Sequence, residues 1–440
     1  MTTKYWVGGA VTIEEQWTVT FTGTFVQNDT VSITVNNKTL TLTLADASRL
    51  SLANVATDFA AMINGNSANG SETRSALGSE VGEFATWSAA ASGATVVITG
   101  DDDGRPMGTL TVSDYETSTG TSPDTGTGGA DMTIAKTRSG VGPYTWDVAS
   151  NWSSNAVPGA GDDVIFDYRA ANGVKYNLDQ SSVTVDNIYV RDSYKYGIGL
   201  PAVNTDTATL PYGEHLTQYL TLDGVGSGSG VVKVDNPMGS SIKIDAGDTA
   251  TDLIVYGTGS SVDDAIPACD LKVNHASAEL HVLGGDVGLC TADGATGEVS
   301  AITMGRGSGA TLTIGGSPTV PTIDLSGGTL RTKASHATIN QSGGTLHQLN
   351  NTLTTLNLNG GTAKIYSNST ITTVNMTDGT LDFSVDSRTK TVTNMNMYAL
   401  GAIKDPQGVV TWTNGLDVYG TINDVTLDFP ARRTWSLSTI

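Results

Sequence analysis

The last third of the chain alternates Thr with aliphatic residues after a recurring glycine turn. Four segments carry this pattern, at 326–330, 342–346, 359–363 and 377–381, with the sequences SGGTL, SGGTL, NGGTA and TDGTL. Their successive spacings are 16, 17 and 18 residues. A turn and a short strand that recur at a nearly constant period are typical of stacked β-rungs. The pattern therefore predicts a mainly β chain, folded as a single-stranded β-solenoid (β-helix) of short rungs, with Thr and Asn side chains stacked between rungs.

Alternation nearer the N-terminus predicts a second kind of unit. Apolar and polar residues alternate in three runs between 17 and 44, which indicates half-buried strands. A helix is predicted after Ser51, because apolar residues then recur at helical spacing. Two more strands are expected at 94–99 and 109–112. Residues 11–113 are therefore predicted to form a small α+β domain.

The remaining boundaries follow from composition. Residues 114–142 are mostly Ser, Thr, Gly and Asp, which predicts a linker with one short strand around Met132. Short strands then return and continue to the end of the chain, so residues 143–440 are assigned to the solenoid. A C-terminal cap is expected around Trp412 and Trp435.

Charge narrows the classes of function. The chain has 440 residues, of which 44 are acidic and 23 basic, and its formal net charge is −21. So few cations argue against nucleic acid as a partner, because such binding relies on neutralising phosphates. They argue equally against an anionic membrane surface. No apolar run approaches the ~20 residues that cross a bilayer, so no membrane insertion is expected.

Candidate chemistry is sparse. Cys269 and Cys290 either form a disulfide bond with each other or remain reduced, and we favour two reduced thiols. The Asp-rich segment 101–104 lacks the spacing of a calcium loop, which favours a charged hairpin turn over a Ca²⁺ site. His336 and His347 fall on predicted rungs and belong to no metal or nucleophile motif. We therefore predict no catalytic residue, no metal ligand and no cofactor.

One motif carries a resemblance to known proteins. Trp146-Asp147 is followed by Asn151-Trp152 and then by the run VPGAGDDVIF at 157–166. This series resembles the opening rung of a family of β-solenoid proteins found among phage structural genes and in planctomycete genomes, and the likeness covers roughly residues 140 to 430. The resemblance implies a structural role on a phage particle and brings no catalytic residues with it.

The same resemblance bears on the first ten residues. In related proteins a segment like Tyr5-Trp6-Val7-Gly8-Gly9 runs directly into the Trp-Asp motif, whereas residues 11–142 intervene here. We therefore expect residues 1–10 to be the first strand of the solenoid cap, with the α+β domain inserted after it. A solenoid must cover its terminal rung, because a bare strand edge invites aggregation. We expect Trp6, Trp146 and Trp152 to form that cover.

These observations favour a non-enzymatic virion structural protein of a bacteriophage, either a head decoration or fibre or a tail appendage. The N-terminal segment lacks the basic region and apolar core of a secretory signal, which fits a protein exposed on a virion and released by lysis. Its partners would be other virion proteins of the capsid or tail. We expect a homo-oligomer, and a trimer by analogy with other rod-shaped appendages.

Two alternatives remain open at this point. A tailspike-like enzyme that binds or cleaves polysaccharide would need two carboxylates about 5 to 9 Å apart on one face, beside aromatic rings. The most suitable cluster for contact with a host surface glycan comprises Tyr212, Glu214, His215 and Tyr219, although we favour an ordinary irregular loop as its explanation. The other alternative is a bacterial cell-surface adhesin.

Overall fold

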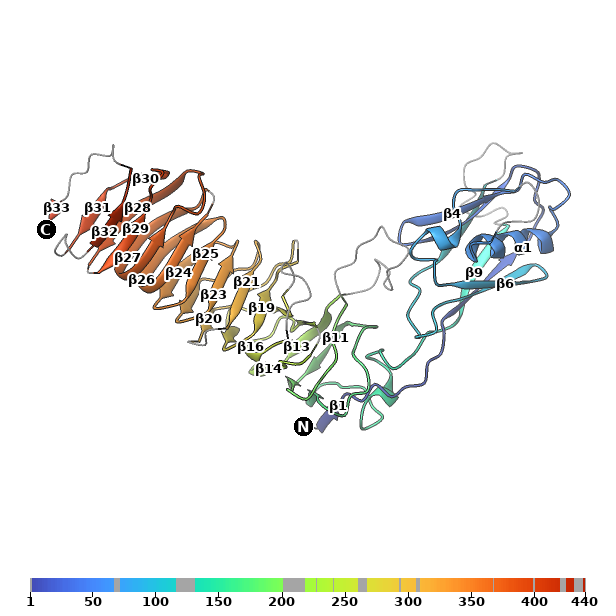
Figure 1. Ribbon diagram of the computed structural model, residues 1–440. Coiled ribbons are helices and arrows are strands. Elements are labelled where there is room, and N and C mark those ends of the chain that lie inside the picture. The colour runs from blue at the N-terminus through green and yellow to red at the C-terminus, as the bar shows by residue number, and fades with distance from the viewer. Residues whose placement is uncertain are drawn as a thin grey trace.

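The computed structural model describes residues 2–66, 72–115, 131–200, 218–226, 228–239, 241–259, 267–292, 294–305, 309–366, 368–398, 400–419, 425–430 and 438–439. The protein is mainly β, with 49% strand and 5% helix. A parallel β-solenoid of about 11 turns is joined to two four-stranded antiparallel sheets (Figure 1). The predicted fold class, a β-solenoid with a small α+β unit near the N-terminus, is confirmed.

The solenoid begins at β1 and resumes at β10, after the inserted unit. Its strands are β1 (Thr2–Tyr5), β10 (Asp162–Phe166), β11 (Asp179–Val185), β12 (Asn187–Val190), β13 (Leu220–Val225), β14 (Gly230–Asp235), β15 (Ile242–Asp245), β16 (Thr251–Gly257), β17 (Cys269–Lys272), β18 (Glu279–Val282), β19 (Asp286–Leu289), β20 (Ala301–Met304), β21 (Thr311–Ile314), β22 (Thr322–Leu325), β23 (Thr329–Thr332), β24 (His336–Gln341), β25 (Thr345–Gln348), β26 (Thr352–Ile365), β27 (Thr370–Asp382), β28 (Lys390–Met397), β29 (Gly401–Lys404), β30 (Val410–Trp412), β31 (Leu416–Val418), β32 (Val425–Asp428) and β33 (Ser438–Thr439).

Each rung stacks on the next in register, and the apolar side chains point inward. Ile302, Ile323, Ile339 and Leu356 are successive partners on β20, β22, β24 and β26, and all four are buried. The same series of register partners runs without a break from Val164 on β10 to Leu416 on β31. Because alternate residues face opposite sides of a strand, one aliphatic residue in two is enough to fill this core.

The glycine turns of the repeat are required by the close stacking of rungs. Gly328, Gly344, Gly361 and Gly379 all have positive φ, between 67° and 95°. A Cβ atom on Gly344 would lie 2.6 Å from the carbonyl oxygen of Gly328, and one on Gly361 would lie 2.4 Å from that of Gly344. Only glycine accommodates both the positive φ and the close backbone approach at these corners.

Outward-facing amides join the rungs on one face of the solenoid. Asn340 donates to Asp324 over 2.8 Å, and Asn357 donates to Asn340 over 2.7 Å. Asn375 and Asn396 extend the series, each with a hydrogen bond of 2.9 Å to the rung before it. An amide both donates and accepts, so one residue type can continue such a ladder through any number of rungs.

The inserted unit packs one helix against its strands. Its elements are β2 (Gln16–Phe21), β3 (Thr30–Val35), β4 (Lys38–Thr43), α1 (Leu52–Ile63), β5 (Thr73–Arg74), η1 (Gly78–Glu80), β6 (Ser88–Ser92), β7 (Thr95–Thr99), β8 (Thr111–Tyr115) and β9 (Met132–Arg138). The sheets run in the order β6-β7-β2-β9 and β5-β4-β3-β8. Phe59 of α1 and Phe21 of β2 meet edge to face in the core, with ring centroids 5.5 Å apart.

The range 114–142, predicted to be a linker, contributes two pieces to this unit. β8 continues to Tyr115, and β9 pairs antiparallel with β2 from Gln16 opposite Arg138 to Phe21 opposite Met132. Composition missed the length of β9 because most of its side chains are exposed. Backbone hydrogen bonds along one side are sufficient to hold an edge strand, so it needs few apolar residues.

Candidate functional site

The three tryptophans expected at the end of the solenoid lie together there. Trp6, Trp146 and Trp152 are each at most 1% exposed. The Trp152 ring lies 5.1 Å from that of Trp6 and 4.7 Å from that of Trp146, both edge to face. Phe166 on β10 lies beneath them, with its ring centroid 6.4–6.5 Å from each. We call Trp6, Trp146 and Trp152 the tryptophan cap.

Backbone pairing and one buried amide position the cap. β1 pairs in parallel with β10, from Thr2 opposite Asp162 to Tyr5 opposite Ile165. The Asn151 side chain, which is fully buried, accepts a hydrogen bond from the backbone N–H of Ala10 over 2.8 Å. It donates two more, each 2.8 Å, to the carbonyl oxygens of Gly142 and Thr145. Asn151 therefore joins the chain entering the insert to the chain leaving it.

The Asp-rich turn 101–104 lies at the junction between the insert and the solenoid. The Tyr176 hydroxyl donates a hydrogen bond to the Asp103 carboxylate. Gly104 has φ of +77°, and a Cβ atom there would lie 2.1 Å from the carbonyl oxygen of Val141. Asp101 forms an ion pair with Arg105, although burial raises the pKa of the Asp101 carboxyl. These contacts identify the turn as the segment through which the insert contacts the capped end of the solenoid.

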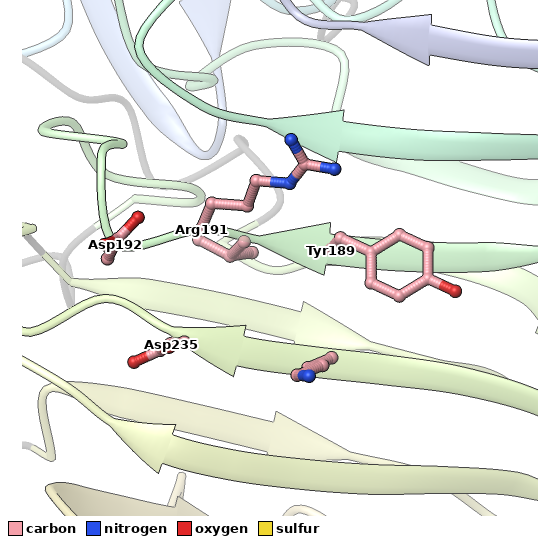
Figure 2. A pocket seen from close by; sticks show the side chains of 6 residues that line it. Tyr189, Arg191, Asp192 and Asp235 are labelled. Atoms are coloured by element: carbon pink, nitrogen blue, oxygen red, sulfur yellow. The ribbon is translucent and has the colours of Figure 1, made fainter.

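A surface cavity of about 310 Å³ lies at the ends of β12 and β14. Figure 2 shows Tyr189 on one strand, Arg191 and Asp192 after the end of that strand, and Asp235 at the end of the next. Tyr189 and Lys233 are register partners, so an aromatic ring and an ammonium group lie on neighbouring rungs. Val190 completes the lining. Tyr189, Arg191, Asp192, Lys233 and Asp235 are called the Tyr189 pocket below.

The Tyr189 pocket holds charges of both signs beside aromatic rings. The Arg191 guanidinium lies 3.7 Å from the buried carboxylate of Asp167, and the Lys233 ammonium lies 4.5 Å from the ring centroid of Tyr256. Burial, and then the nearby Asp163 carboxylate, raise the pKa of the Tyr189 hydroxyl, which therefore remains a hydrogen-bond donor at neutral pH. Such a surface can stack a sugar ring and bind its hydroxyl groups. The Tyr189 pocket cannot be inferred from the sequence, because Tyr189 and Lys233 become neighbours only through the register of two rungs.

The glycan-contact residues predicted from the sequence are only partly described by the structure. Tyr212, Glu214 and His215 lie outside the described residues. Tyr219 is 5% exposed, and its hydroxyl donates to Asp270 over 2.5 Å. Burial raises the pKa of the Tyr219 hydroxyl far above its usual value, with a further contribution from Asp270. The Lys272 ammonium lies 3.9 Å from the centroid of the Tyr219 ring, so this side chain belongs to a buried polar cluster.

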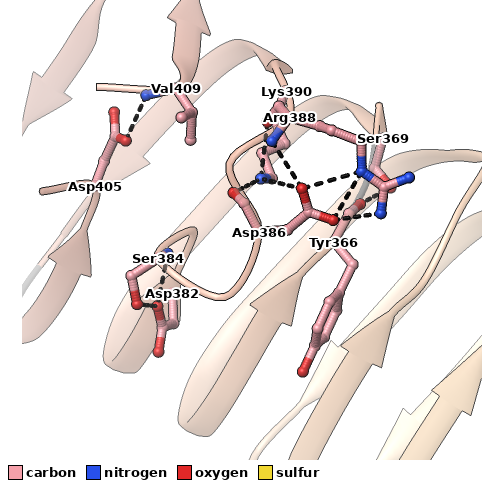
Figure 3. A network of polar contacts seen from close by, with 9 residues as sticks. All are labelled: Tyr366, Ser369, Asp382, Ser384, Asp386, Arg388, Lys390, Asp405 and Val409. Atoms are coloured by element: carbon pink, nitrogen blue, oxygen red, sulfur yellow. Dashed lines mark hydrogen bonds and ion pairs between the residues drawn. The ribbon is translucent and has the colours of Figure 1, made fainter. Parts of the chain in front are cut away.

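Three further carboxylates, those of Asp382, Asp386 and Asp405, lie near one another at strand ends. Asp382 is the last residue of β27, Asp386 precedes β28 and Asp405 follows β29 (Figure 3). Asp405 accepts hydrogen bonds from the backbone N–H groups of Val409 and Val410, at 2.8 and 3.3 Å. Asp386 accepts from the Arg388 guanidinium at 2.9 and 3.0 Å. Buried Lys390 donates to the carbonyl oxygen of Arg388 over 2.8 Å. Asp386, Arg388 and Lys390 hold the loop before β28 in place, and Asp405 holds the turn before β30.

The remaining candidates are buried or structural. His336 is 3% exposed and lies between the Thr332 hydroxyl at 2.7 Å and the carbonyl oxygen of Val320 at 2.9 Å. Cys269 and Cys290 are free and buried, and burial raises the pKa of Cys290 to about 12. Within the described ranges, no three His, Cys, Asp or Glu side chains come together as a metal site would require.

The other end of the solenoid also carries aromatic residues. Trp412 meets Phe383 and Phe429 edge to face, with ring centroids 5.9 and 6.2 Å apart. Trp435, the other residue expected in a C-terminal cap, lies outside the described residues. In the part of the chain that the structure describes, no helix has both the length and the apolar character to cross a membrane. Searches against protein-family models, curated proteins and solved structures gave no match to this chain.

Proposed function

We propose that this chain is a non-enzymatic structural protein of a phage particle, exposed on the surface of the virion as a head decoration, a fibre or a tail appendage. The observation that supports this proposal is the unbroken register from Val164 to Leu416. A rod whose every rung is bonded to the next bends little, because bending would break parallel hydrogen bonds along one face. Stiffness of this kind suits a projecting body.

The position of the insert fits a role in attachment or spacing. The insert leaves the solenoid between β1 and β10, at the end closed by the tryptophan cap, and the rest of the solenoid extends away from it (Figure 1). One end of the rod therefore carries a folded unit that could bind a capsid or tail protein. In this proposal the other partners are further copies of the same chain.

Immunogold electron microscopy of a lysate from the source organism or phage tests the proposal. An antibody raised against the purified chain should label the heads or tails of intact particles. Label confined to cell envelopes would overturn the virion proposal and favour an adhesin. Adsorbing the antibody on the purified insert leaves only the antibodies that bind the solenoid. Comparing the label before and after adsorption distinguishes the positions of the two units on the particle.

A second candidate function is contact with a host glycan at the Tyr189 pocket. It is favoured by the combination of the Tyr189 ring, two cations and two carboxylates around one cavity. The test is a glycan array probed with the labelled protein and with two variants. Tyr189→Ala should lose the bound glycans, whereas Tyr398→Ala should keep them, because exposed Tyr398 stacks on Tyr419 near the other end of the rod. Equal binding by all three proteins would exclude this pocket.

A further inference from the structure

Three basic residues are stacked directly above one another on one face of the solenoid. Arg331 of β23, His347 of β25 and Lys364 of β26 are successive register partners. They face outward, because the residues on either side of each point into the core. Adjacent rungs are about 4.8 Å apart, so the three side chains form one short column of basic residues. We call Arg331, His347 and Lys364 the basic column.

The same column continues with alternating charge, which makes the basic column unusual. Beyond Lys364 the register partners are Asp382, Lys404 and Asp428. Lys404 therefore has an acidic residue on the rung at each side. Like charges placed directly opposite on neighbouring strands are destabilising, and here the His347 rung separates the Arg331 charge from the Lys364 charge. This arrangement occurs in a chain with 44 acidic and 23 basic residues.

The charges of the basic column are not joined in close ion pairs within the part of the chain that the structure describes. Neither Arg331 nor Lys364 forms an ion pair within that part of the chain. The nearest acidic register partner, Asp382, accepts hydrogen bonds from the backbone N–H and the hydroxyl of Ser384, at 2.9 and 2.6 Å. Both bonds are to Oδ1 of Asp382, which ties that oxygen to its own loop, and the Asp382 carboxylate forms no ion pair with Lys364.

An aromatic ring lies beside the column. The Tyr366 ring stacks on the His347 ring, with centroids 5.6 Å apart and planes 15° apart, and the Tyr366 hydroxyl lies 3.2 Å from His347 Nδ1. Partial burial, and then the charges of Lys364 and Arg331, lower the pKa of His347. At neutral pH the column therefore presents the charges of Arg331 and Lys364. The neutral His347 ring lies between them, and the Tyr366 ring stacks on it. Lys333, also exposed, follows Arg331 by two residues and so faces the same side.

We propose that Arg331 and Lys364, with the His347–Tyr366 ring pair, bind an acidic polysaccharide laid across the rungs. Arg331 would bind a uronate carboxylate in a bidentate manner, Lys364 would pair with a second carboxylate, and the ring pair would stack on a sugar between them. The net charge of −21 disfavours a polyanion as dense as DNA, which carries about one charge per 1.7 Å. A polyuronate has only one charge per sugar. The proposed site is separate from the Tyr189 pocket, whose lining residues come from β12, β14 and the residues after β12.

Isothermal titration calorimetry of the full chain tests this inference. The probes are sodium polygalacturonate, neutral dextran and single-stranded oligo(dT), each at low and high NaCl. The unaltered protein should bind polygalacturonate with an affinity that falls as salt rises, and should bind dextran and oligo(dT) far more weakly. The double variant Arg331→Gln/Lys364→Gln should weaken the binding of polygalacturonate at least about tenfold.

Lys404→Gln is the matched control, since Lys404 belongs to the same column, is exposed, and lies between two acidic residues. It should leave the affinity unchanged, and the melting temperature of the double variant should be no lower than that of the unaltered protein. Three results would each overturn the inference: no binding of polygalacturonate by the unaltered protein, equal loss on changing Lys404, or tighter binding of oligo(dT). Unaltered affinity in a well-folded double variant would do so as well.

Discussion

The Tyr176 hydroxyl, at the capped end of the solenoid, donates a hydrogen bond to the Asp103 carboxylate in the insert, 73 residues away in the sequence. This contact joins two units that each have their own hydrophobic core. Close backbone packing of Gly104 against Val141 lies beside it. The orientation of the insert on the rod therefore depends on a small number of contacts at one turn.

Removing that hydroxyl should loosen the insert without unfolding either unit. A hydrogen bond to a charged group contributes about 1.5–3 kcal/mol. Tyr176→Phe should therefore lower the free energy needed for local opening at this junction by roughly that amount. Hydrogen–deuterium exchange should become faster at 101–104 and 140–142 and stay unchanged in the rungs beyond β20. Tyr144→Phe is the control, because the Tyr144 ring packs against Tyr176, with centroids 6.3 Å apart, and its hydroxyl makes no hydrogen bond to another of the described residues. Equal effects of both changes would contradict the role of the hydroxyl.

The tryptophan cap should be essential for solubility. Truncating Trp152 removes both edge-to-face contacts of the cap and should cost about 3–5 kcal/mol, as for other large core residues. It also exposes the terminal strand edge, so we expect Trp152→Ala to associate, as measured by light scattering at increasing protein concentration. Trp87→Ala offers a comparison in the core of the insert, where Trp87 packs on Phe84. That variant should destabilise the insert but remain monodisperse.

The sequence predicted the register of the rungs where rung length is constant, but not where it varies. From Gly328 to Gly379 each rung adds 16 to 18 residues, so the partners of Ile339 and Thr345 can be inferred from the repeat alone. Tyr189 and Lys233 are also register partners but lie 44 residues apart, and no period connects them. A pocket built from such a pair could not be predicted without the register.

Buried polar groups are the other feature that the sequence concealed. Asn151 belongs to a motif recognised by resemblance, yet its type gave no sign that its amide would join residues 10, 142 and 145. Asn is usually exposed, and its burial here is stable only because three hydrogen bonds satisfy the amide and its partners. Such a role depends on three chain segments meeting, which local patterns do not encode.

The glycine corners should tolerate no side chain. At Gly344, with φ of +67°, a Cβ atom would lie 2.6 Å from the Gly328 carbonyl oxygen. The left-handed conformation alone costs about 1–2 kcal/mol for an L-residue, and the contact adds to that. We expect Gly344→Ala to lower the midpoint of urea unfolding clearly. Gly316→Ala should have little effect, because a Cβ atom at that exposed position has no heavy atom within 4 Å. Similar midpoints for the two variants would contradict the explanation of the repeat.

Burial of His336 should make the solenoid less stable in mild acid. Burial lowers the pKa of His336 below its ordinary value of 6.5, although the Val320 carbonyl oxygen partly opposes this. As pH falls below about 6.5 the unfolded chain therefore takes up a proton that the folded chain does not, and the free energy of unfolding decreases. This stabilisation is complete above pH 6.5 and is lost progressively toward the lowered pKa.

We expect the unaltered protein to lose more stability between pH 7.5 and 5 than His336→Gln, as measured by urea unfolding at each pH. His347→Gln controls for the second histidine with a lowered pKa, and its partial exposure predicts a smaller difference. If His336→Gln and the unaltered protein have parallel pH profiles, His336 does not couple folding to pH.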